Sequence, residues 1–335
     1  MAIELSNLTF TEQDDVVPVS GVAQIFNTAI ANTLAGDDII TGIATDSGGI
    51  RNFGSINTGD DNDIITGTST SGSGIENLSN SSIDTGNGND IITAIGNAYI
   101  LYNNGTINTG NGDDSIIAEE NGNLPLYNSS NDGTINTGNG NDSIILHGGL
   151  YNSGGVFLGD GNDSLTADAD LPDRALENFN VIDTGNGDDS IINYGHLYNE
   201  GIINTGNGND EIYSSFMYNN GGAIITGDGN DSIYTNDGFE SGPNSSGSVF
   251  LGEGRDYLHG FGSGDFYGGN GYDILNFSQA PGTYTVGIWG EGPDKSVIFT
   301  KGNQIMITSE FELLINVGEL YSFASLTAGQ IIEVF

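Results

Sequence analysis

The chain has 335 residues, of which 45 are acidic, five are basic and none is cysteine, and its formal net charge at pH 7 is −40. This charge excludes nucleic acids and anionic membranes as partners, and the lack of cysteine excludes disulfides and thiol chemistry. No segment reaches the roughly 20 apolar residues that a membrane span needs, so we expect no membrane insertion.

Residues 1–32 mix apolar residues such as Leu5, Phe10 and Ile25 with polar ones and are too few to form a domain. We expect them to form an N-terminal cap with an irregular first coil. Residues 1–10 lack a basic region followed by an apolar run, so the sequence predicts no general export signal.

Residues 33–275 repeat one short turn, whose fullest form is Thr-Gly-Asn-Gly-Asn-Asp followed by Ser-Ile-Ile at residues 137–145. Glycine takes positive φ without steric cost, so the backbone carbonyls of such a turn can converge. Converging carbonyls and a carboxylate form an all-oxygen site, which suits Ca²⁺. An apolar residue two positions after each aspartate is expected to enter a core. The predicted metal-ligating aspartates are Asp38, Asp63, Asp90, Asp114, Asp142, Asp163, Asp189, Asp210, Asp231, Asp256 and Asp273.

The turn resembles the calcium-binding nonapeptide of the RTX family (hemolysin-type calcium-binding repeats), Gly-Gly-x-Gly-x-Asp-x-U-x with U apolar. Residues 268–275 match it closely, whereas other copies replace the first glycine by Thr or Leu. The resemblance implies an all-β fold, a right-handed parallel β-solenoid (β-roll) of about eleven coils.

In this family each ion lies between two turns stacked one coil apart and is bound by Asp carboxylates and by carbonyls around the glycines. Two early copies depart from the pattern, because Leu34 and Ala35 precede Gly36 and Asp61 replaces a glycine. The glycines that the resemblance assigns to the sites are Gly59, Gly86, Gly88, Gly110, Gly112, Gly138, Gly140, Gly159, Gly161, Gly185, Gly187, Gly206, Gly208, Gly227, Gly229, Gly252, Gly254, Gly269 and Gly271.

Each coil also has a second half. Nine residues before each repeat aspartate from the second onward lies another small residue, as Gly54 precedes Asp63, and an apolar residue follows it two positions later. This half often reads Leu-Tyr-Asn-x-Gly and has no carboxylate, so we expect about ten Ca²⁺ ions in one row, with a second row as the alternative. Its asparagines are expected to form an amide ladder: Asn52, Asn103, Asn152, Asn178 and Asn199.

Extra residues enter each coil at one place, after the strand that follows the calcium turn. Examples are residues 66–73, 118–129, 167–174 and 236–243. Insertions on one edge of a solenoid are often its binding face, but they are also tolerated as surface loops.

Residues 276–335 are expected to form a C-terminal β-rich cap. Alternation predicts strands at 284–289, 296–299 and 304–308, joined by turns at 291–294 and 301–303. The ending, residues 326–335, resembles the uncleaved signal that RTX proteins present to the type I secretion machinery. The resemblance therefore implies an extracellular, secreted protein, with cell-surface association as a further expectation.

No catalytic motif is present. His147, His196 and His259 are scattered, and neither His-Glu-x-x-His nor Gly-x-Ser-x-Gly occurs. We expect a non-enzymatic protein, with a β-helix polysaccharide-modifying enzyme as a remote alternative. Self-repulsion and high glycine content predict a chain that stays unfolded without calcium and folds after export.

The leading functional hypothesis is a structural or adhesive protein at the cell surface or in extracellular matrix. One alternative is carbohydrate binding, with a surface glycan stacked on Tyr102, Tyr151, Tyr198 and Tyr218, although these rings could instead pack on one another. The other is ice binding by an outward array of Asn87, Asn111, Asn139, Asn186 and Asn207. Asp60, Asp160, Asp228 and Glu253 interrupt that array.

Overall fold

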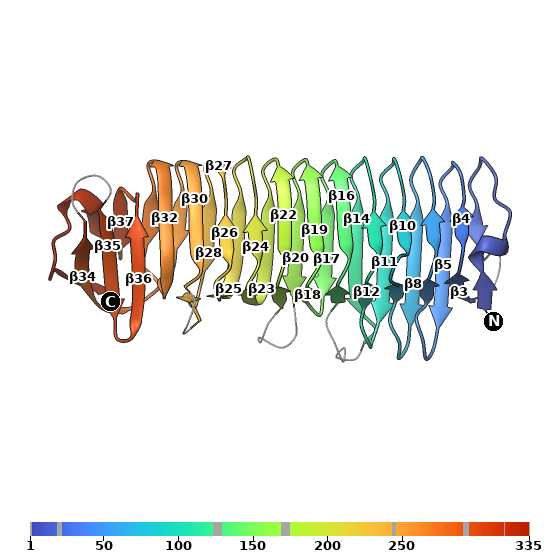
Figure 1. Ribbon diagram of the computed structural model, residues 1–335, viewed down its shortest axis with the longest axis horizontal. Coiled ribbons are helices and arrows are strands. Elements are labelled where there is room, and N and C mark those ends of the chain that lie inside the picture. The colour runs from blue at the N-terminus through green and yellow to red at the C-terminus, as the bar shows by residue number, and fades with distance from the viewer. Residues whose placement is uncertain are drawn as a thin grey trace. The chain divides into compact units, whose positions relative to one another are not determined.

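The computed structural model describes residues 2–18, 22–122, 129–168, 175–242, 246–290, 295–317 and 319–334. The chain divides into unit 1, Met1–Thr184, and unit 2, Gly185–Phe335. Regular structure in the described residues is β-strand apart from two short 3₁₀ helices, η1 (Leu5–Asn7) and η2 (Phe323–Ser325) (Figure 1). None of the described helices is long and apolar enough to cross a membrane.

Each coil of unit 1 contains three strands. The first full set is β5 (Ile39–Ala44), β6 (Ile50–Asn52) and β7 (Ser55–Asn57). Each strand pairs in parallel with its equivalent one coil later, so that Ile40 lies opposite Ile65. The expected parallel β-solenoid is therefore confirmed. The remaining strands are β8 (Ile64–Ser69), β9 (Ile75–Asn77), β10 (Ser82–Asp84), β11 (Ile91–Gly96), β12 (Leu101–Asn103), β13 (Thr106–Asn108), β14 (Ser115–Glu120), β15 (Ser129–Asn131), β16 (Thr134–Asn139), β17 (Ser143–His147), β18 (Leu150–Asn152), β19 (Gly155–Asp160), β20 (Ser164–Asp168), β21 (Leu176–Asn178) and β22 (Val181–Asn186).

The N-terminal segment, expected to hold an irregular first coil, contains β1 (Ala2–Glu4), β2 (Val16–Val17), β3 (Gln24–Asn27) and β4 (Ile30–Asn32). The last three pair in parallel with β5, β6 and β7. Val17, Ile25 and Ala31 are buried like the inward residues of later coils. The stacked register therefore begins near residue 16.

Unit 2 continues the three-stranded pattern in its own coils, in which Ile212, Ile233 and Leu258 lie in register. The strands are β23 (Ser190–Asn199), β24 (Ile202–Asn204), β25 (Glu211–Asn219), β26 (Ala223–Ile225), β27 (Asp228–Gly229), β28 (Ser232–Thr235), β29 (Phe239–Glu240), β30 (Ser248–Gly254), β31 (Tyr257–His259), β32 (Gly264–Gly271) and β33 (Ile274–Asn276).

The C-terminal residues form the three expected strands and three more: β34 (Gly282–Trp289), β35 (Ser296–Lys301), β36 (Gln304–Ser309), β37 (Leu313–Asn316), β38 (Glu319–Ser322) and β39 (Ile331–Val334). β34, β35 and β36 pair antiparallel, whereas β36 and β37 continue the parallel stack on β32 and β33. Phe277, Tyr284 and Phe299 form the aromatic core of this region. The turn expected at 291–294 lies outside the described residues.

The core contains the two rows of inward apolar side chains that the repeat spacing predicts, each residue at most 2% exposed. The remaining strand of each coil adds a third buried row, which includes Ile50, Ile75 and Leu101. Burying each side chain stabilises the fold by about 1.5–3 kcal/mol. The first row is Ile40, Ile65, Ile92, Ile116, Ile144, Leu165, Ile191, Ile212, Ile233, Leu258 and Leu275, and the second is Ile56, Ile83, Ile107, Ile135, Val156, Ile182, Ile203, Ile224, Val249 and Phe266.

The insertion at 66–73 partly extends strand β8, which runs to Ser69. The other three insertions named above lie partly outside the described residues.

Candidate metal centre: a buried row of carboxylates

The repeated turns owe their shape to residues with positive φ at two positions, four and two residues before each aspartate. All nineteen site glycines have φ between 91° and 153°. Leu34 and Asp61, which depart from the glycine pattern, still adopt φ of 84° and 82°. A Cβ on Gly110 would lie 1.7 Å from the carbonyl oxygen of Gly86 in the adjacent coil, so close stacking requires glycine there.

The turns of unit 1 bring their aspartates together in one row. The backbone N–H of Asp38 donates to Oδ1 of Asp63 at 2.8 Å, and the same bond recurs coil after coil as far as Asp142 and Asp163. Asp15 joins the row at its start, because its N–H donates to Oδ1 of Asp38 at 2.7 Å. The repeat spacing missed Asp15, because no glycines precede it.

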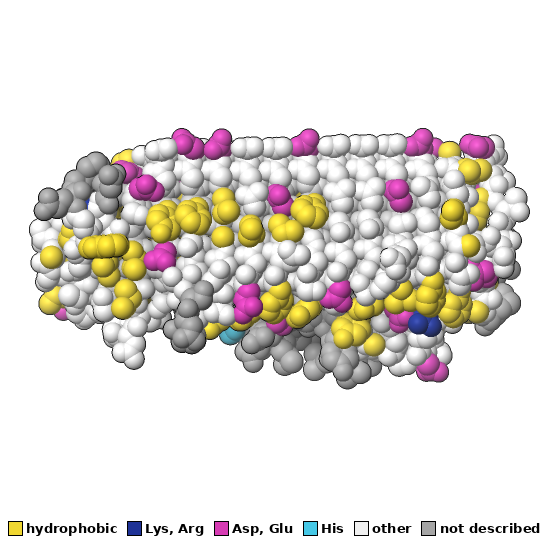
Figure 2. All heavy atoms as spheres, in the orientation of Figure 1, with side chains coloured by type: hydrophobic (Ala, Val, Ile, Leu, Met, Phe, Trp, Pro, Cys, Tyr) yellow, Lys and Arg dark blue, Asp and Glu magenta, His cyan; other side chains and the backbone are white. Residues whose placement is uncertain are grey.

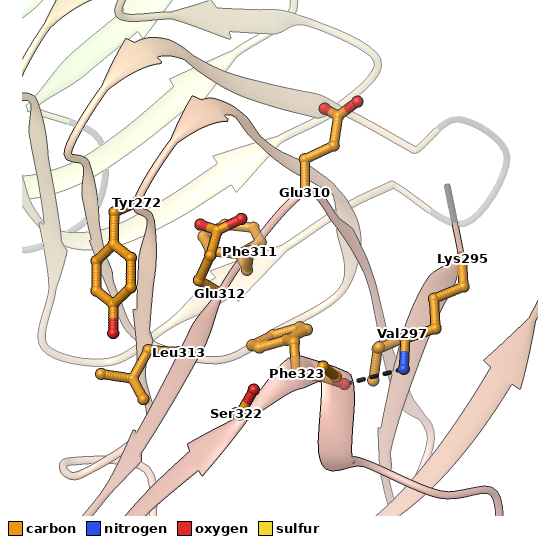
Figure 3. Close-up of a pocket in the computed structure, with 10 residues that line it drawn as sticks. Tyr272, Lys295, Val297, Glu310, Phe311, Glu312, Leu313, Ser322 and Phe323 are labelled. Carbon is orange, nitrogen blue, oxygen red and sulfur yellow. Dashed lines mark hydrogen bonds between the residues drawn. The ribbon is translucent and has the colours of Figure 1, made fainter. Parts of the chain in front are cut away.

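Unit 2 has the same arrangement from Asp189 to Asp273, with N–H to Oδ1 distances of 2.8–3.0 Å. The row ends at Glu312, whose Oε2 accepts the N–H of Asp273 at 2.6 Å. Glu312 lines a hollow of about 620 Å³ with Glu310, Tyr272 and Phe311, shown in Figure 3. On another side of this hollow Lys295 Nζ donates to the carbonyl oxygen of Phe323 at 3.0 Å.

Asp15 and Glu312 at the ends of the row are half-buried, whereas the eleven repeat aspartates are buried, each at most 2% exposed. In nine of them Oδ2 is buried and accepts no hydrogen bond from the part of the chain that the structure describes: Asp38, Asp63, Asp90, Asp114, Asp142, Asp210, Asp231, Asp256 and Asp273. A buried carboxylate oxygen without a hydrogen bond is costly unless a cation or a proton neutralises it.

Burial accordingly raises the pKa of Asp63, Asp114, Asp210 and Asp256 to about 7, from an ordinary value of 3.8. Repulsion from the neighbouring carboxylates of the row acts in the same direction, as Asp90 and Asp38 do on Asp63. At neutral pH the row therefore favours any ligand that supplies positive charge.

A row of buried threonines accompanies the aspartates, five residues before eight of the eleven, and the sequence pattern had not been interpreted in this way. The hydroxyl of Thr58, for example, partly offsets the rise in the pKa of Asp63. It also lies 3.4 Å from the carbonyl oxygen of Thr85. The signal was present in the sequence as the Thr that opens most copies of the turn. The row comprises Thr33, Thr58, Thr85, Thr109, Thr137, Thr184, Thr205 and Thr226.

The available donors are therefore carboxylate, hydroxyl and main-chain carbonyl oxygens, which are the hard ligands that Ca²⁺ prefers. Within the described ranges no three His, Cys, Asp or Glu side chains meet as a metal-binding group. An ion at one of these turns would thus draw on the unbonded Oδ2 atoms of those nine aspartates and on turn carbonyls for its remaining ligands. The residues fit Ca²⁺ and do not fit a metal that requires nitrogen or sulfur.

The outward positions of the turns carry polar ladders. Nδ2 of Asn111 donates to Oδ1 of Asn87, and Nδ2 of Asn139 to Oδ1 of Asn111, at 2.5 and 2.6 Å. Asp60 begins this ladder by accepting from Asn87. In each unit Figure 2 shows acidic side chains at intervals along the edge where the turns lie.

At the second corner of the coil, the expected asparagine ladder is present. Its Nδ2 atoms donate to Oδ1 one coil later at 2.8–2.9 Å from Asn27 to Asn178 in unit 1, and Asn199 donates to Asn219 at 3.0 Å in unit 2. Most of these amides also donate to a backbone carbonyl, as Asn52 does to Ser82 at 2.7 Å. Asn27, Asn77, Asn131 and Asn219 extend the predicted set.

The tyrosines proposed to stack on sugars pack instead against neighbouring rings. Tyr198 and Tyr218 are stacked 5.1 Å apart, Tyr151 lies against Phe179 and Tyr102 against Tyr99. This geometry favours the packing explanation for that row.

No protein-family model matches the chain, and no curated protein matches it. Among solved structures, the chain is similar to a hyperactive, Ca²⁺-dependent, β-helical antifreeze protein from an Antarctic bacterium. The two share 20% sequence identity over 80% of this chain and 78% of that chain, with a TM-score of 0.50. This similarity establishes the β-solenoid fold that the two chains share.

Proposed function

We propose that this chain is a non-enzymatic, calcium-binding protein that folds and becomes rigid on binding Ca²⁺ outside the cell, where it serves a structural or adhesive role. The observation that carries the proposal is Asp114 and the eight other buried aspartates of the row whose Oδ2 accepts no hydrogen bond within the described part of the chain. Bound Ca²⁺ would supply the positive charge that this row needs. The RTX-like turn and the calcium dependence named for the antifreeze protein support the same ligand.

Within the site, the aspartates would hold the ion through Oδ2 while Oδ1 keeps the adjacent coil in register through the backbone N–H. The glycines allow the coils to approach closely enough for carboxylates of adjacent coils to share an ion. Calcium is abundant outside cells and scarce inside, and extracellular modules bind it at 10⁻⁴–10⁻³ M. Export by a type I system, followed by folding, is part of the proposal.

The adjacent residues Asp114 and Asp113 provide a matched test. Asp114 is buried in the row, whereas Asp113 is exposed on the same turn and its Oδ1 accepts from Asn141. Asp114→Asn keeps an oxygen for the N–H of Asp90 but removes the charge. We expect it to weaken calcium binding by isothermal titration and to stabilise the calcium-free fold by about 1–3 kcal/mol. Asp113→Asn should change the free energy of unfolding by less than about 0.5 kcal/mol. Equal effects of the two variants would contradict the proposal.

Ice binding is a second candidate, favoured by the regular outward amide ladder of Asn87, Asn111 and Asn139. The carboxylates of Asp60, Asp160, Asp228 and Glu253 interrupt that surface with charge, which makes the structural or adhesive role the better supported proposal. Thermal hysteresis of the calcium-loaded protein tests this candidate, since an adhesive solenoid shows none.

A further inference from the structure

A group of aromatic side chains lies on the outer surface of unit 2, opposite the buried core. Tyr213, Tyr234 and His259 are in register on β25, β28 and β31. Tyr257 lies beside them, with its ring 5.4 Å from that of Tyr234. Tyr213, Tyr234 and Tyr257 are half-buried, while Ile212, Ile233 and Leu258 on the same strands point inward and are buried. We call this group, with Tyr257, the aromatic platform.

The fold itself does not require aromatic residues at these positions. In unit 1 the equivalent outward position, next to the inward apolar residue, is occupied by Thr41, Thr66, Thr93, Ile117, Ile145 and Thr166. Those coils stack in the same parallel register with small or aliphatic side chains. The platform is therefore a local addition to the solenoid of unit 2.

The platform lines a hollow of about 490 Å³ whose other lining residues are polar: Glu211, Asn236, Asn276, Ser278 and Gln279. Nδ2 of Asn236 donates to the hydroxyl of Tyr213 at 2.7 Å, and Asn276 donates to the hydroxyl of Tyr257. These bonds fix two of the rings. Asn236 and Gln279 also line an adjoining hollow of about 250 Å³, so the binding surface continues beyond the platform.

The lining points to an uncharged, hydroxyl-rich ligand. Ring faces next to amide and hydroxyl groups suit the C–H faces and hydroxyls of a sugar, because the faces attract the weakly positive C–H groups while the amides both donate and accept. Burial lowers the pKa of His259, so its imidazole is neutral at pH 7. Glu211 at the hollow and the net charge of −40 repel anionic ligands.

We propose that this hollow binds a neutral oligosaccharide, with Tyr213, Tyr234 and Tyr257 stacking on sugar rings and Asn236 and Gln279 hydrogen bonding to hydroxyls. The inference rests on the adhesive role proposed above and supplies its ligand class. It places sugar binding at a polar hollow of unit 2 rather than at Tyr102, Tyr151, Tyr198 and Tyr218.

The test uses the full-length, calcium-loaded protein titrated calorimetrically with neutral hexasaccharides of glucose, mannose, xylose and N-acetylglucosamine, and with an anionic oligogalacturonate. At least one neutral probe should bind and the anionic probe should not. Tyr234→Ala should weaken binding about tenfold or more, whereas Tyr234→Phe, which keeps the ring face, should stay close to the unchanged protein. Tyr102→Ala in unit 1 is the matched control and should bind normally.

Binding of no neutral probe, or equal binding by Tyr234→Ala, would overturn the inference. Far-UV circular dichroism recorded with and without calcium on the same samples separates this failure from failure of the calcium proposal. A protein that folds on Ca²⁺ but binds no sugar would refute only the oligosaccharide site.

Discussion

The backbone N–H of Asp273 donates to Oε2 of Glu312 at 2.6 Å, although 39 residues separate them in the sequence. Leu275 and Leu314, each two residues further on, lie opposite each other in β33 and β37. Glu312 therefore occupies the position that an aspartate holds in every preceding coil. The carboxylate row continues into the C-terminal region with one longer side chain.

This relationship predicts the effects of two substitutions at one site. Glu312→Ala leaves the N–H of Asp273 without its acceptor and should lower the free energy of unfolding by about 1–3 kcal/mol. Glu312→Gln keeps a side-chain oxygen and should cost much less. Urea unfolding of both variants in calcium measures the difference, and equal losses would show that the hydrogen bond does not stabilise the end of the row.

Close stacking of the turns predicts that a single methyl group is not tolerated at Gly110. Its φ is 101°, and a Cβ would lie 1.7 Å from the carbonyl oxygen of Gly86. Gly122 also has positive φ, 77°, but among the described residues, apart from its chain neighbours, no atom lies within 4 Å of its Cβ position. Gly122→Ala should cost about 1 kcal/mol from backbone strain alone, and Gly110→Ala several times more. Thermal unfolding compares the stability of the two variants. Equal stability would contradict the conclusion that close stacking requires glycine at position 110.

The asparagine ladder predicts that substitutions of the adjacent residues Asn103 and Asn104 differ in their effect on stability. The side chain of Asn103 is buried and bonds to Asn77, Asn131 and the carbonyl oxygen of Thr134. Asn103→Ala should lower the free energy of unfolding by about 2–4 kcal/mol, because several buried groups lose partners. Among the described residues, the side chain of half-buried Asn104 makes one long hydrogen bond, 3.4 Å to the hydroxyl of Tyr102, so Asn104→Ala should be nearly neutral. A small loss of stability in Asn103→Ala would mean that water molecules replace the lost hydrogen bonds of the ladder.

The buried carboxylates predict how the calcium-free protein responds to pH. In Asp63, Asp114, Asp210 and Asp256 the folded-state pKa of about 7 exceeds the ordinary value of 3.8, so the folded state binds more protons than the unfolded state between those values. Stability without calcium should therefore fall as pH rises from about 4 to about 7. The calcium-free chain is expected to be disordered near pH 7, so its β-structure content in calcium-free buffer, followed by far-UV circular dichroism from pH 7 down to pH 4, measures the slope. Asp114→Asn should flatten the slope, and stability that rises with pH would contradict the assigned burial.

The resemblance of the turn to the RTX nonapeptide implied the solenoid, and the repeat predicted two buried rows because apolar residues such as Ile40 and Ile56 have a fixed spacing from the turn residues. It also predicted the ladder at Asn103, since a short polar side chain recurring at one place in each coil must meet its copy. Asp15 and Glu312 were not predicted as members of the carboxylate row. Neither residue follows the two glycines that mark the turn, so only the strand register in the structure shows that they belong to the row.

The aromatic platform was not predicted for a different reason. Tyr213, Tyr234 and Tyr257 belong to coils of unequal length, and Tyr257 stands two residues before the register position of His259. Sequence spacing predicts that Tyr213 and Tyr234 occupy equivalent positions in adjacent coils. It does not predict that a residue from a different position, such as Tyr257, packs against them. The three-dimensional arrangement brings these rings and Asn236 around one hollow.

The dependence of folding on calcium is tested most directly by far-UV circular dichroism during a calcium titration of the chelator-treated protein, with native mass spectrometry counting the bound ions. A cooperative change from disordered chain to β-structure, with about ten ions bound in one row, is the result expected for a solenoid whose buried carboxylates require Ca²⁺. A protein already fully β-structured in chelator at neutral pH, and no more stable with calcium, would contradict that requirement.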